Sequence, residues 1–167
     1  IGRSAKALLE NSRDKIAALL NCKPSEIYFT SGGSESDNSA IFGISAACGK
    51  NGIVTSTIEH PAVLSSVKSA AANKKECKFI PVSTNGVIDI NAAKKLAAAD
   101  IGLVSAMLVN NETGVVQPID ELAEIAHSAG AYIHTDAVQS PSCTKIDLQK
   151  LNVDSLSLSA HKFGGPK

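Results

Sequence analysis

Apolar residues recur with two different periods along this chain, and the two kinds of stretch alternate from one end to the other. Apolar positions three and four residues apart, as at Leu8, Leu9, Ile16 and Leu20, are typical of amphipathic helices. Short runs rich in β-branched and aromatic residues are typical of strands. The predicted helices are 4–20, 35–48, 61–73, 90–99 and 119–129. The predicted strands are 26–31, 52–57, 78–82, 101–109, 131–136 and 155–159.

Single residues support several of these boundaries. Pro61 suits the first turn of a helix, where the backbone N–H that proline lacks has no partner in any case. Gly130 is a natural residue directly after a helix. Asn85 and Gly86 form a pair typical of turns.

Strands and helices alternate throughout, which indicates a mostly parallel sheet covered on both faces. We therefore expect one α/β domain with three α/β/α layers in these 167 residues. Ligands of such sheets bind beyond the carboxyl ends of the strands. Five polar groups stand at predicted strand ends, and together they describe a site better than chance would. They are Gly32–Ser34, His60, Asn111, Asp136 and Lys162.

Composition narrows the function classes. Sixteen basic and sixteen acidic residues cancel without forming blocks, which argues against a nucleic-acid surface, as does the absence of Trp. No apolar run reaches the length of a membrane span. The four cysteines are widely spaced, and neither they nor the four histidines show metal-ligand spacing. We expect no metal site and a reducing, cytoplasmic compartment.

Lys162 lies where the last predicted strand, with its alternating Ser and Leu, should end before Gly164, Gly165 and Pro166 break the chain. Burial at such a place lowers the pKa of a lysine, and a neutral amine is the nucleophile that forms Schiff bases with carbonyls and with pyridoxal phosphate. Lysine is mostly exposed in proteins, so a surface lysine beside a turn is the alternative.

The Gly32-Gly33-Ser34 loop stands between a predicted strand and a predicted helix. Glycines allow close approach of a ligand, and a helix N-terminus offers free N–H groups and partial positive charge to a phosphate. Ser159 and His161 could add donors to the same phosphate. An ordinary strand-to-helix turn with Ser34 as N-cap explains the loop equally well.

The other strand-end residues suit a flat, charged ring. Asp136 could keep a ring nitrogen protonated, as an electron-sink cofactor requires, and Gln139 could reach the same ligand. His60 could stack on the ring and move protons. Asn111 could donate to a ring oxygen or to substrate. Taken singly, these residues are also consistent with a capped loop, a structural histidine and plain turn chemistry.

Five stretches together give a specific resemblance. The sequence resembles the cysteine desulfurases of the NifS/IscS type, within the fold-type I, class V aminotransferase-like pyridoxal phosphate enzymes. The stretches stand in family order over essentially the whole chain. They are FTSGGSESDN (29–38), EHPAV (59–63), VNNETG (109–114), HTDAVQ (134–139) and SAHK (159–162).

The resemblance implies a role for each matched residue. Lys162 resembles the lysine that forms the Schiff base with pyridoxal 5'-phosphate, and Asp136 the partner of the pyridine nitrogen. Gln139 resembles the contact to the phenolate oxygen. His60 resembles the ring-stacking residue that also takes part in proton transfer, and Asn111 a contact to cofactor and substrate. The phosphate contacts are implied at Gly33, Ser34, Ser159 and His161, with Ser34 standing where the family usually has Thr.

The resemblance also implies an activity and partners. The family converts L-cysteine to L-alanine, passes the sulfur as a persulfide to an acceptor protein of the scaffold type for iron–sulfur cluster assembly or thiolation, and forms homodimers. Family members are longer than this chain. We expect residues 1–167 to be a partial large domain, with its remaining strand and the C-terminal small domain outside this sequence. The substrate-binding arginine and the catalytic cysteine are expected there too, so none of Cys22, Cys48, Cys77 and Cys143 is assigned as nucleophile.

Three alternatives remain at this stage. A related class V enzyme, such as a selenocysteine lyase or an aminotransferase, would share Lys162 and Asp136. A non-catalytic fragment could hold cofactor or a partner without turnover. An unrelated α/β domain could carry these polar strand ends by coincidence.

Overall fold

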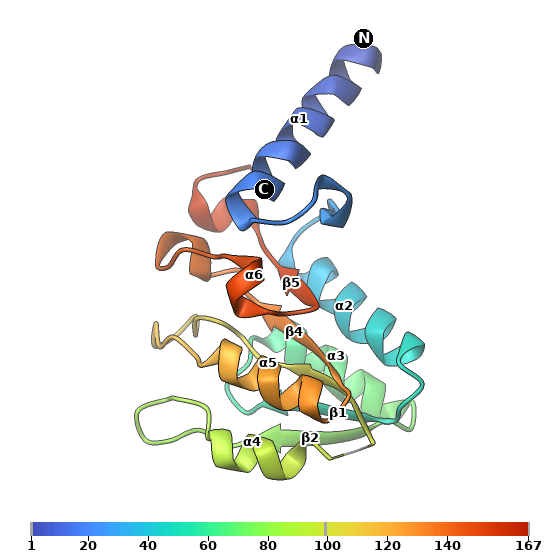
Figure 1. Ribbon diagram of the computed structural model, residues 1–167, viewed down its shortest axis with the longest axis vertical. Helices are drawn as coiled ribbons and strands as arrows, with labels where there is room; N and C mark the ends of the chain where they lie inside the picture. Colours follow the sequence, from blue (N-terminus) through green and yellow to red (C-terminus); the bar gives the residue numbers. More distant parts are fainter. Residues whose placement is uncertain (1, 99, 167) are drawn as a thin grey trace.

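A single parallel sheet with helices on both faces forms the body of the molecule (Figure 1). The computed structural model describes residues 2–98 and 100–166. The strands are β1 (Gly52–Ser56), β2 (Glu76–Ile80), β3 (Ile101–Ser105), β4 (Tyr132–Asp136) and β5 (Ser155–Ser157). The α-helices are α1 (Gly2–Leu20), α2 (Gly33–Ala47), α3 (Pro61–Ala72), α4 (Ile90–Leu96), α5 (Ile119–Ser128) and α6 (Leu148–Leu151). The 3₁₀ helices are η1 (Pro24–Glu26), η2 (Ser140–Ser142) and η3 (Ala160–Phe163).

The strand order is β2-β1-β3-β4-β5, and every pair is parallel. After β1 the chain moves outward to β2 and then returns to place β3 on the other side of β1. In a sheet of this kind the reversal opens a crevice at the carboxyl ends of the strands on either side. The predicted α/β class and mostly parallel sheet are confirmed.

The core has one part on each face of the sheet, because successive strand residues point to opposite faces. On one face, Ile41 of α2 and Val63 of α3 pack with Ile53 and Leu103. On the other face, Leu122 of α5 belongs to a larger cluster that includes Val54, Val104 and Ile133 from the sheet. The predicted three layers are therefore present.

Two predicted helix boundaries are confirmed in detail. Pro61 is the first residue of α3, and the His60 side chain caps that helix by accepting a hydrogen bond from the Ala62 N–H at 3.1 Å. Gly130 follows α5 with a φ of +66°, the left-handed conformation that suits glycine there.

The predicted strand at 26–31 is wrong. Glu26 ends η1, and residues 27–31 pair with no strand among the described residues. The Ile27 backbone is extended, but the Arg13 guanidinium, rather than a neighbouring strand, donates to its carbonyl oxygen. The β-branched and aromatic residues of this segment favour a strand, but the segment has no neighbouring strand to pair with among the described residues. Tyr28 remains 83% exposed.

Other boundaries differ by a few residues. The strand predicted at 101–109 ends at Ser105, the one at 155–159 ends at Ser157, and the one at 78–82 lies at Glu76–Ile80. The end predicted for the helix at 90–99 lies outside the described residues. Gly33 and Ser34 belong to the first turn of α2 rather than to a loop before it, and the short helix α6 was not predicted.

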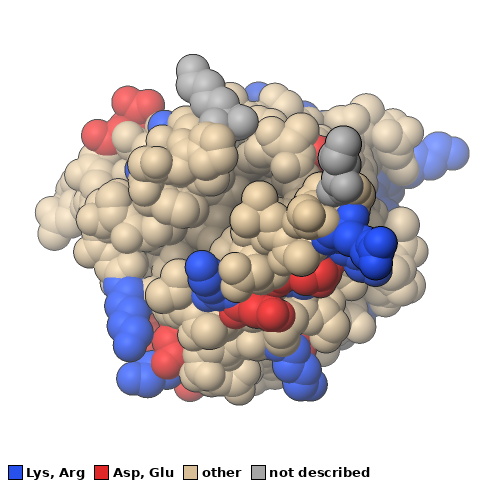
Figure 2. Space-filling view, turned by 90° about the horizontal axis from the view of Figure 1, so that it is seen from above, with Lys and Arg blue, Asp and Glu red and all other residues tan. Residues whose placement is uncertain are grey.

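Helix α1 projects from the body of the molecule (Figure 1). Large apolar side chains of this helix are exposed, among them Leu8 and Leu19. From the α1 side, basic and acidic side chains lie close to one another among a majority of other residues (Figure 2). Over residues 2–98 and 100–166, none of the helices combines the length and the apolar character that crossing a bilayer requires.

Candidate active site

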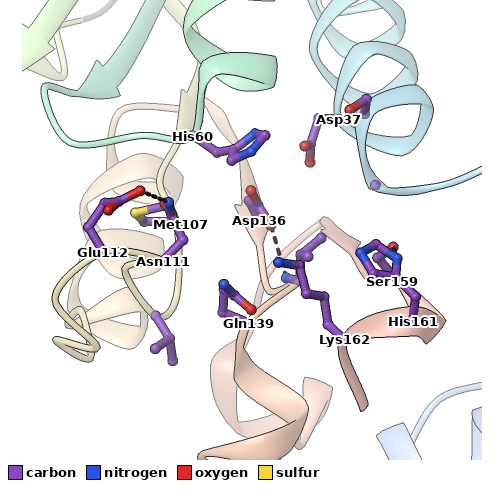
Figure 3. Close-up of a pocket in the computed structure, with 14 residues that line it drawn as sticks. Asp37, His60, Met107, Asn111, Glu112, Asp136, Gln139, Ser159, His161 and Lys162 are labelled. Carbon is purple, nitrogen blue, oxygen red and sulfur yellow. Dashed lines mark hydrogen bonds between the residues drawn. The ribbon is translucent and has the colours of Figure 1, made fainter. Parts of the chain in front are cut away.

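A cavity of about 400 Å³ lies at the carboxyl ends of the strands (Figure 3). All nine residues predicted as site residues line it. They are Gly33, Ser34, His60, Asn111, Asp136, Gln139, Ser159, His161 and Lys162. Segments far apart in the sequence therefore meet in one place, which is the arrangement expected for a site in an open α/β sheet.

The N-terminus of α2 forms one wall of the pocket. Gly32 precedes the helix, and the first helical residues, Gly33 and Ser34, line the cavity. A Cβ on Gly33 would stand 2.9 Å from a methyl group of Val138, so glycine lets the helix end approach the segment after β4. The N-cap position belongs to Gly32, so the alternative interpretation of Ser34 as N-cap is wrong. Ser34 instead lies in the first turn of the helix, where backbone N–H groups have no partner within the helix.

Asp136 is the last residue of β4 and is buried, with only 5% of its surface exposed. Its Oδ1 accepts a hydrogen bond from the Val138 N–H at 2.9 Å. Burial raises the pKa of this carboxyl, while the Val138 N–H and the nearby His60 ring oppose the rise. A cationic group in the pocket would therefore find its favourable partner here.

His60 stands opposite Asp136 on the turn between β1 and α3 (Figure 3). Its Nδ1 accepts the Ala62 N–H, so the proton of the neutral ring lies on Nε2. The cap fixes the ring against the first turn of α3 and leaves the side chain exposed to the cavity.

Asn111 and Gln139 approach from two further segments. The Asn111 amide donates to the Glu112 carboxylate at 2.8 Å, and both side chains line the cavity beyond β3. Gln139 lies directly before η2. Both can reach polar groups of a bound molecule from the side of the pocket that faces away from α2 (Figure 3).

Lys162 lies in η3, and its side chain is exposed at the pocket rim. The expectation that Lys162 is buried at the end of a strand is wrong. The reason is that β5 ends at Ser157 and the chain turns into η3, which carries the lysine out of the sheet. In the same turn the Ser159 hydroxyl and the His161 Nδ1 are 2.9 Å apart.

Sequence reasoning missed several lining residues. They are Asp37, Met107, Val109, Glu112 and Val138. Asp37 carried a signal, because it stands four residues after Gly33 and so shares one face of α2 with it. Met107 and Val109 gave none, because they belonged to a predicted strand that ends earlier in the structure.

Below the pocket, a fully buried histidine joins three strands. The two ring nitrogens of His134 in β4 bond with Ser105 of β3 at 2.9 Å and Ser157 of β5 at 3.0 Å. Its Nε2 is 3.6 Å from Oδ1 of Asp37. Burial lowers the pKa of His134 to about 4 and, with the nearby Asp136 charge, raises that of Asp37 to about 7. The ring is thus neutral at physiological pH.

The whole chain matches one family. The family model described as aminotransferase class-V matches residues 1–167. The chain belongs to the aminotransferase class-V family.

Among the described residues of this class-V chain, no group of three or more His, Cys, Asp or Glu side chains is arranged to hold a metal ion.

The relatives of this class-V chain are similar along its full length. Cysteine desulfurase IscS of Methanosarcina thermophila is 44% identical over 169 aligned positions, covering 100% of this chain and 42% of the relative. The mitosomal cysteine desulfurase of Encephalitozoon cuniculi is 39% identical and covers 99% of this chain and 39% of its own length. The predicted resemblance to cysteine desulfurases is confirmed. The chain spans less than half the length of these relatives.

Solved structures give the same result for the fold. A NifS-like protein superposes with a TM-score of 0.96 at 38% identity, over 99% of this chain and 47% of that one. SspA, solved in complex with cysteine, has a TM-score of 0.92 at 36% identity, over 98% of this chain and 48% of its own. The class-V chain therefore has the fold of these proteins over its described length.

Proposed function

We propose that this chain is the cofactor-binding part of a pyridoxal phosphate-dependent cysteine desulfurase. The parent enzyme would convert L-cysteine to L-alanine and transfer the sulfur to an acceptor protein. The observation that carries the proposal is the convergence of Lys162, Asp136 and the α2 N-terminus on one cavity. The relatives named cysteine desulfurase support the reaction class.

The pocket fits pyridoxal phosphate by its donor set. An anionic phosphate suits the N-terminus of α2, where Gly33 leaves room and Ser34 offers a hydroxyl. Ser159 and His161 add polar groups on the same side. The buried Asp136 carboxyl suits a cationic ring nitrogen, and the exposed Lys162 amine can reach a carbonyl carbon.

When bound, the cofactor supplies an electron sink for the negative charge that develops at the substrate α-carbon. The residues supply orientation and proton transfer. Asp136 would hold a proton on the ring nitrogen, and the Lys162 Nζ would serve as the nucleophile and as the base for the α-proton. His60 and Asn111, which line the cavity after β1 and β3, would orient the ring.

The proposal extends to the organisation of the parent protein. Residues 1–167 form a partial large domain, and the small domain belongs to the rest of the parent. The full-length enzyme is proposed to act as a cytoplasmic homodimer and to meet a scaffold-type sulfur acceptor for iron–sulfur cluster assembly. The length of the relatives supports a longer parent, since this chain covers 42% of the first of them.

Trapping the cofactor on Lys162 tests the proposal. The chain is incubated with pyridoxal phosphate, reduced with borohydride and digested, and the modified residue is identified by mass spectrometry. We expect one adduct, on Lys162, and loss of the long-wavelength absorbance in Lys162→Ala. The control is Lys68→Ala, which removes an exposed lysine of α3 that does not line the pocket. A folded chain that takes up no cofactor, or an adduct scattered over surface lysines, would contradict the proposal.

A cofactor-holding fragment without turnover is the second candidate. It is favoured by one observation, since the described residues that line the cavity include no cysteine. The chemistry of a selenocysteine lyase or an aminotransferase would use the same Lys162 and Asp136, and a comparison of substrates in the parent enzyme distinguishes them from a desulfurase.

A further inference from the structure

Two short segments form the walls of the pocket on the β1 and β3 side. One follows β1 and carries His60, and the other follows β3 and carries Met107 and Asn111. Loops at such positions are free to move unless side chains fasten them. Each segment also carries a buried polar residue that does not line the pocket, Glu59 in the first and Asn110 in the second.

Glu59 reaches from the first segment into the second. Its side chain is 5% exposed, and its Oε1 accepts the Met107 N–H at 3.0 Å. The same oxygen accepts the Ser56 hydroxyl at the end of β1. The N–H groups of Ala106 and Leu108, on either side of Met107, donate to carbonyl oxygens of β4, whereas the Met107 N–H donates to Glu59. Beyond the ends of β1 and β3, the Glu59 side chain therefore links the two segments through hydrogen bonds, as backbone pairing links the strands themselves.

Asn110 makes the reciprocal contact from the second segment. Its Nδ2 donates to the Ile58 carbonyl oxygen at 3.0 Å, across to the segment of His60. Its Oδ1 accepts the N–H groups of Glu112 and Thr113 at 3.0 and 2.9 Å, which closes the turn that carries Asn111. Glu59 thus bonds from the His60 segment to the Met107 segment, and Asn110 bonds from the Met107 segment back to the His60 segment.

We infer that Glu59 and Asn110 are positioning residues that fasten the His60 segment to the Met107–Asn111 segment and so set the place of His60 opposite Asp136. The inference deepens the proposed function, because the spacing matters for pyridoxal phosphate only if that cofactor binds. Neither side chain lines the cavity, so each acts through its neighbours.

The hydrogen bond from the Met107 N–H to Glu59 does not require an ionised carboxylate. Burial raises the pKa of Glu59 to about 8, so the group is largely protonated at neutral pH. Its Oε1 remains an acceptor for Met107, while Oε2 has no hydrogen-bond partner among the described residues. Glutamine has nearly the same shape and keeps the acceptor, whereas alanine leaves the buried Met107 N–H unsatisfied.

The experiment compares Glu59→Gln, Glu59→Ala and Asn110→Asp, with Glu124→Ala on the exposed side of α5 as the matched control. Asn110→Asp keeps the oxygen that accepts from Glu112 and Thr113 but removes the donor to Ile58. The first readout is the set of histidine ring signals in the NMR spectrum of the chain without cofactor. We expect the His60 signal to shift or broaden in Glu59→Ala and Asn110→Asp. It should keep its position in Glu59→Gln and Glu124→Ala, and the His127 signal should not move in any of the Glu59 and Asn110 variants.

The second readout is the dissociation constant of pyridoxal phosphate. Losing one buried contact should weaken binding about tenfold in Glu59→Ala and in Asn110→Asp. Glu59→Gln should stay within about twofold of the parent, because it restores the contact. If Glu59→Ala does not fold, the contrast between Glu59→Gln and Asn110→Asp still decides the question.

The outcomes separate the two claims. An unmoved His60 signal in both folded disruptive variants overturns the positioning role, whatever the cofactor does. A Glu59→Gln variant that behaves like Glu59→Ala overturns it too, because shape and acceptor are then not enough. A His60 response in a chain that binds no pyridoxal phosphate supports the positioning role and contradicts the proposed function instead.

Discussion

Three carboxyl groups are buried at or beside the pocket, and no lysine or arginine pairs with any of them within the described residues. Asp136 keeps its charge best, because the Val138 N–H and His60 favour the carboxylate. Burial raises the pKa of Asp37 to about 7 and that of Glu59 to about 8. Glu59 is therefore mainly an acid at neutral pH, and Asp37 is divided between its acid and carboxylate forms.

This arrangement predicts that the folded chain loses stability as pH rises above 6.5. The pKa of Glu59 rises from 4.5 in the unfolded chain to about 8 in the folded protein. Between these values the folded chain binds a proton that the unfolded chain has released, so the free energy of unfolding falls with rising pH. His134, with its pKa lowered from 6.5 to about 4, acts in the opposite direction only below 6.5.

Urea unfolding of the parent and of Glu59→Gln at several pH values checks this. Between pH 6.5 and about 8 the parent should lose on the order of 1 kcal/mol through Glu59. The Gln variant should lose less over the same interval, because its amide does not titrate. Parallel curves for the two proteins would show that Glu59 is ionised in the folded state and would contradict the assignment.

At the scale of an element, helix α2 has its N-terminus at the pocket, whereas part of its interior is exposed to solvent. Gly33 in its first turn faces Val138 at the pocket, whereas Gly43 in its interior is exposed with open space around it. The same substitution at the two sites therefore separates fit at the pocket from helix stability.

Gly33→Ala should weaken pyridoxal phosphate binding several-fold, because the new Cβ stands 2.9 Å from a Val138 methyl group that must shift within the pocket lining. Gly43→Ala should leave binding unchanged and raise the free energy of unfolding by about 0.5–1 kcal/mol through helix propensity. Titration with the cofactor and urea unfolding measure the two effects. Equal binding by both variants would show that the α2 N-terminus does not approach the ligand closely.

The same elements show how far the sequence alone could lead. Strands such as β3 and β4 were predictable because their apolar runs are local, and the residues after them then had to meet at one edge of the sheet. Residues 27–31 carry the same local signal without a pairing partner, so propensity misled there. The exposure of Lys162 depends on where β5 stops, which the Ser-Leu alternation does not reveal.

The supporting residues were harder to predict than the lining ones. Glu59 stands next to His60 in the sequence, but its role depends on Met107, which lies 48 residues further along the chain. The pairing of His134 with Ser105 and Ser157 likewise joins three strands. Contacts of this kind are set by the register of the sheet, and hydrophobic periodicity carries no information about them.

At the scale of the whole molecule, the described residues that line the pocket include no thiol. Cys22, Cys48 and Cys77 are partly buried, Cys143 is exposed, and none of the four lines the cavity. A desulfurase needs a thiolate to accept sulfur from the substrate.

We therefore predict that this chain alone, supplied with pyridoxal phosphate and L-cysteine, releases little or no sulfide in the presence of a thiol reductant. A sulfide assay against a full-length cysteine desulfurase measures this, and binding of the cofactor by the same preparation serves as the control. Sustained turnover that survives replacement of all four cysteines by serine would refute the sulfur-transfer mechanism proposed for the parent.

The position of Lys162 on an exposed 3₁₀ turn has a consequence for selectivity. An amine in contact with solvent is accessible to every dissolved aldehyde, so the pocket does not select among aldehydes at the step in which they reach Lys162. Selectivity must then come from the dissociation rate. Only a molecule with both a phosphate and a basic ring can contact the α2 N-terminus and Asp136 at the same time, and such a molecule should dissociate more slowly. Pyridoxal without its phosphate should then join Lys162 about as readily as pyridoxal phosphate does, and leave much sooner.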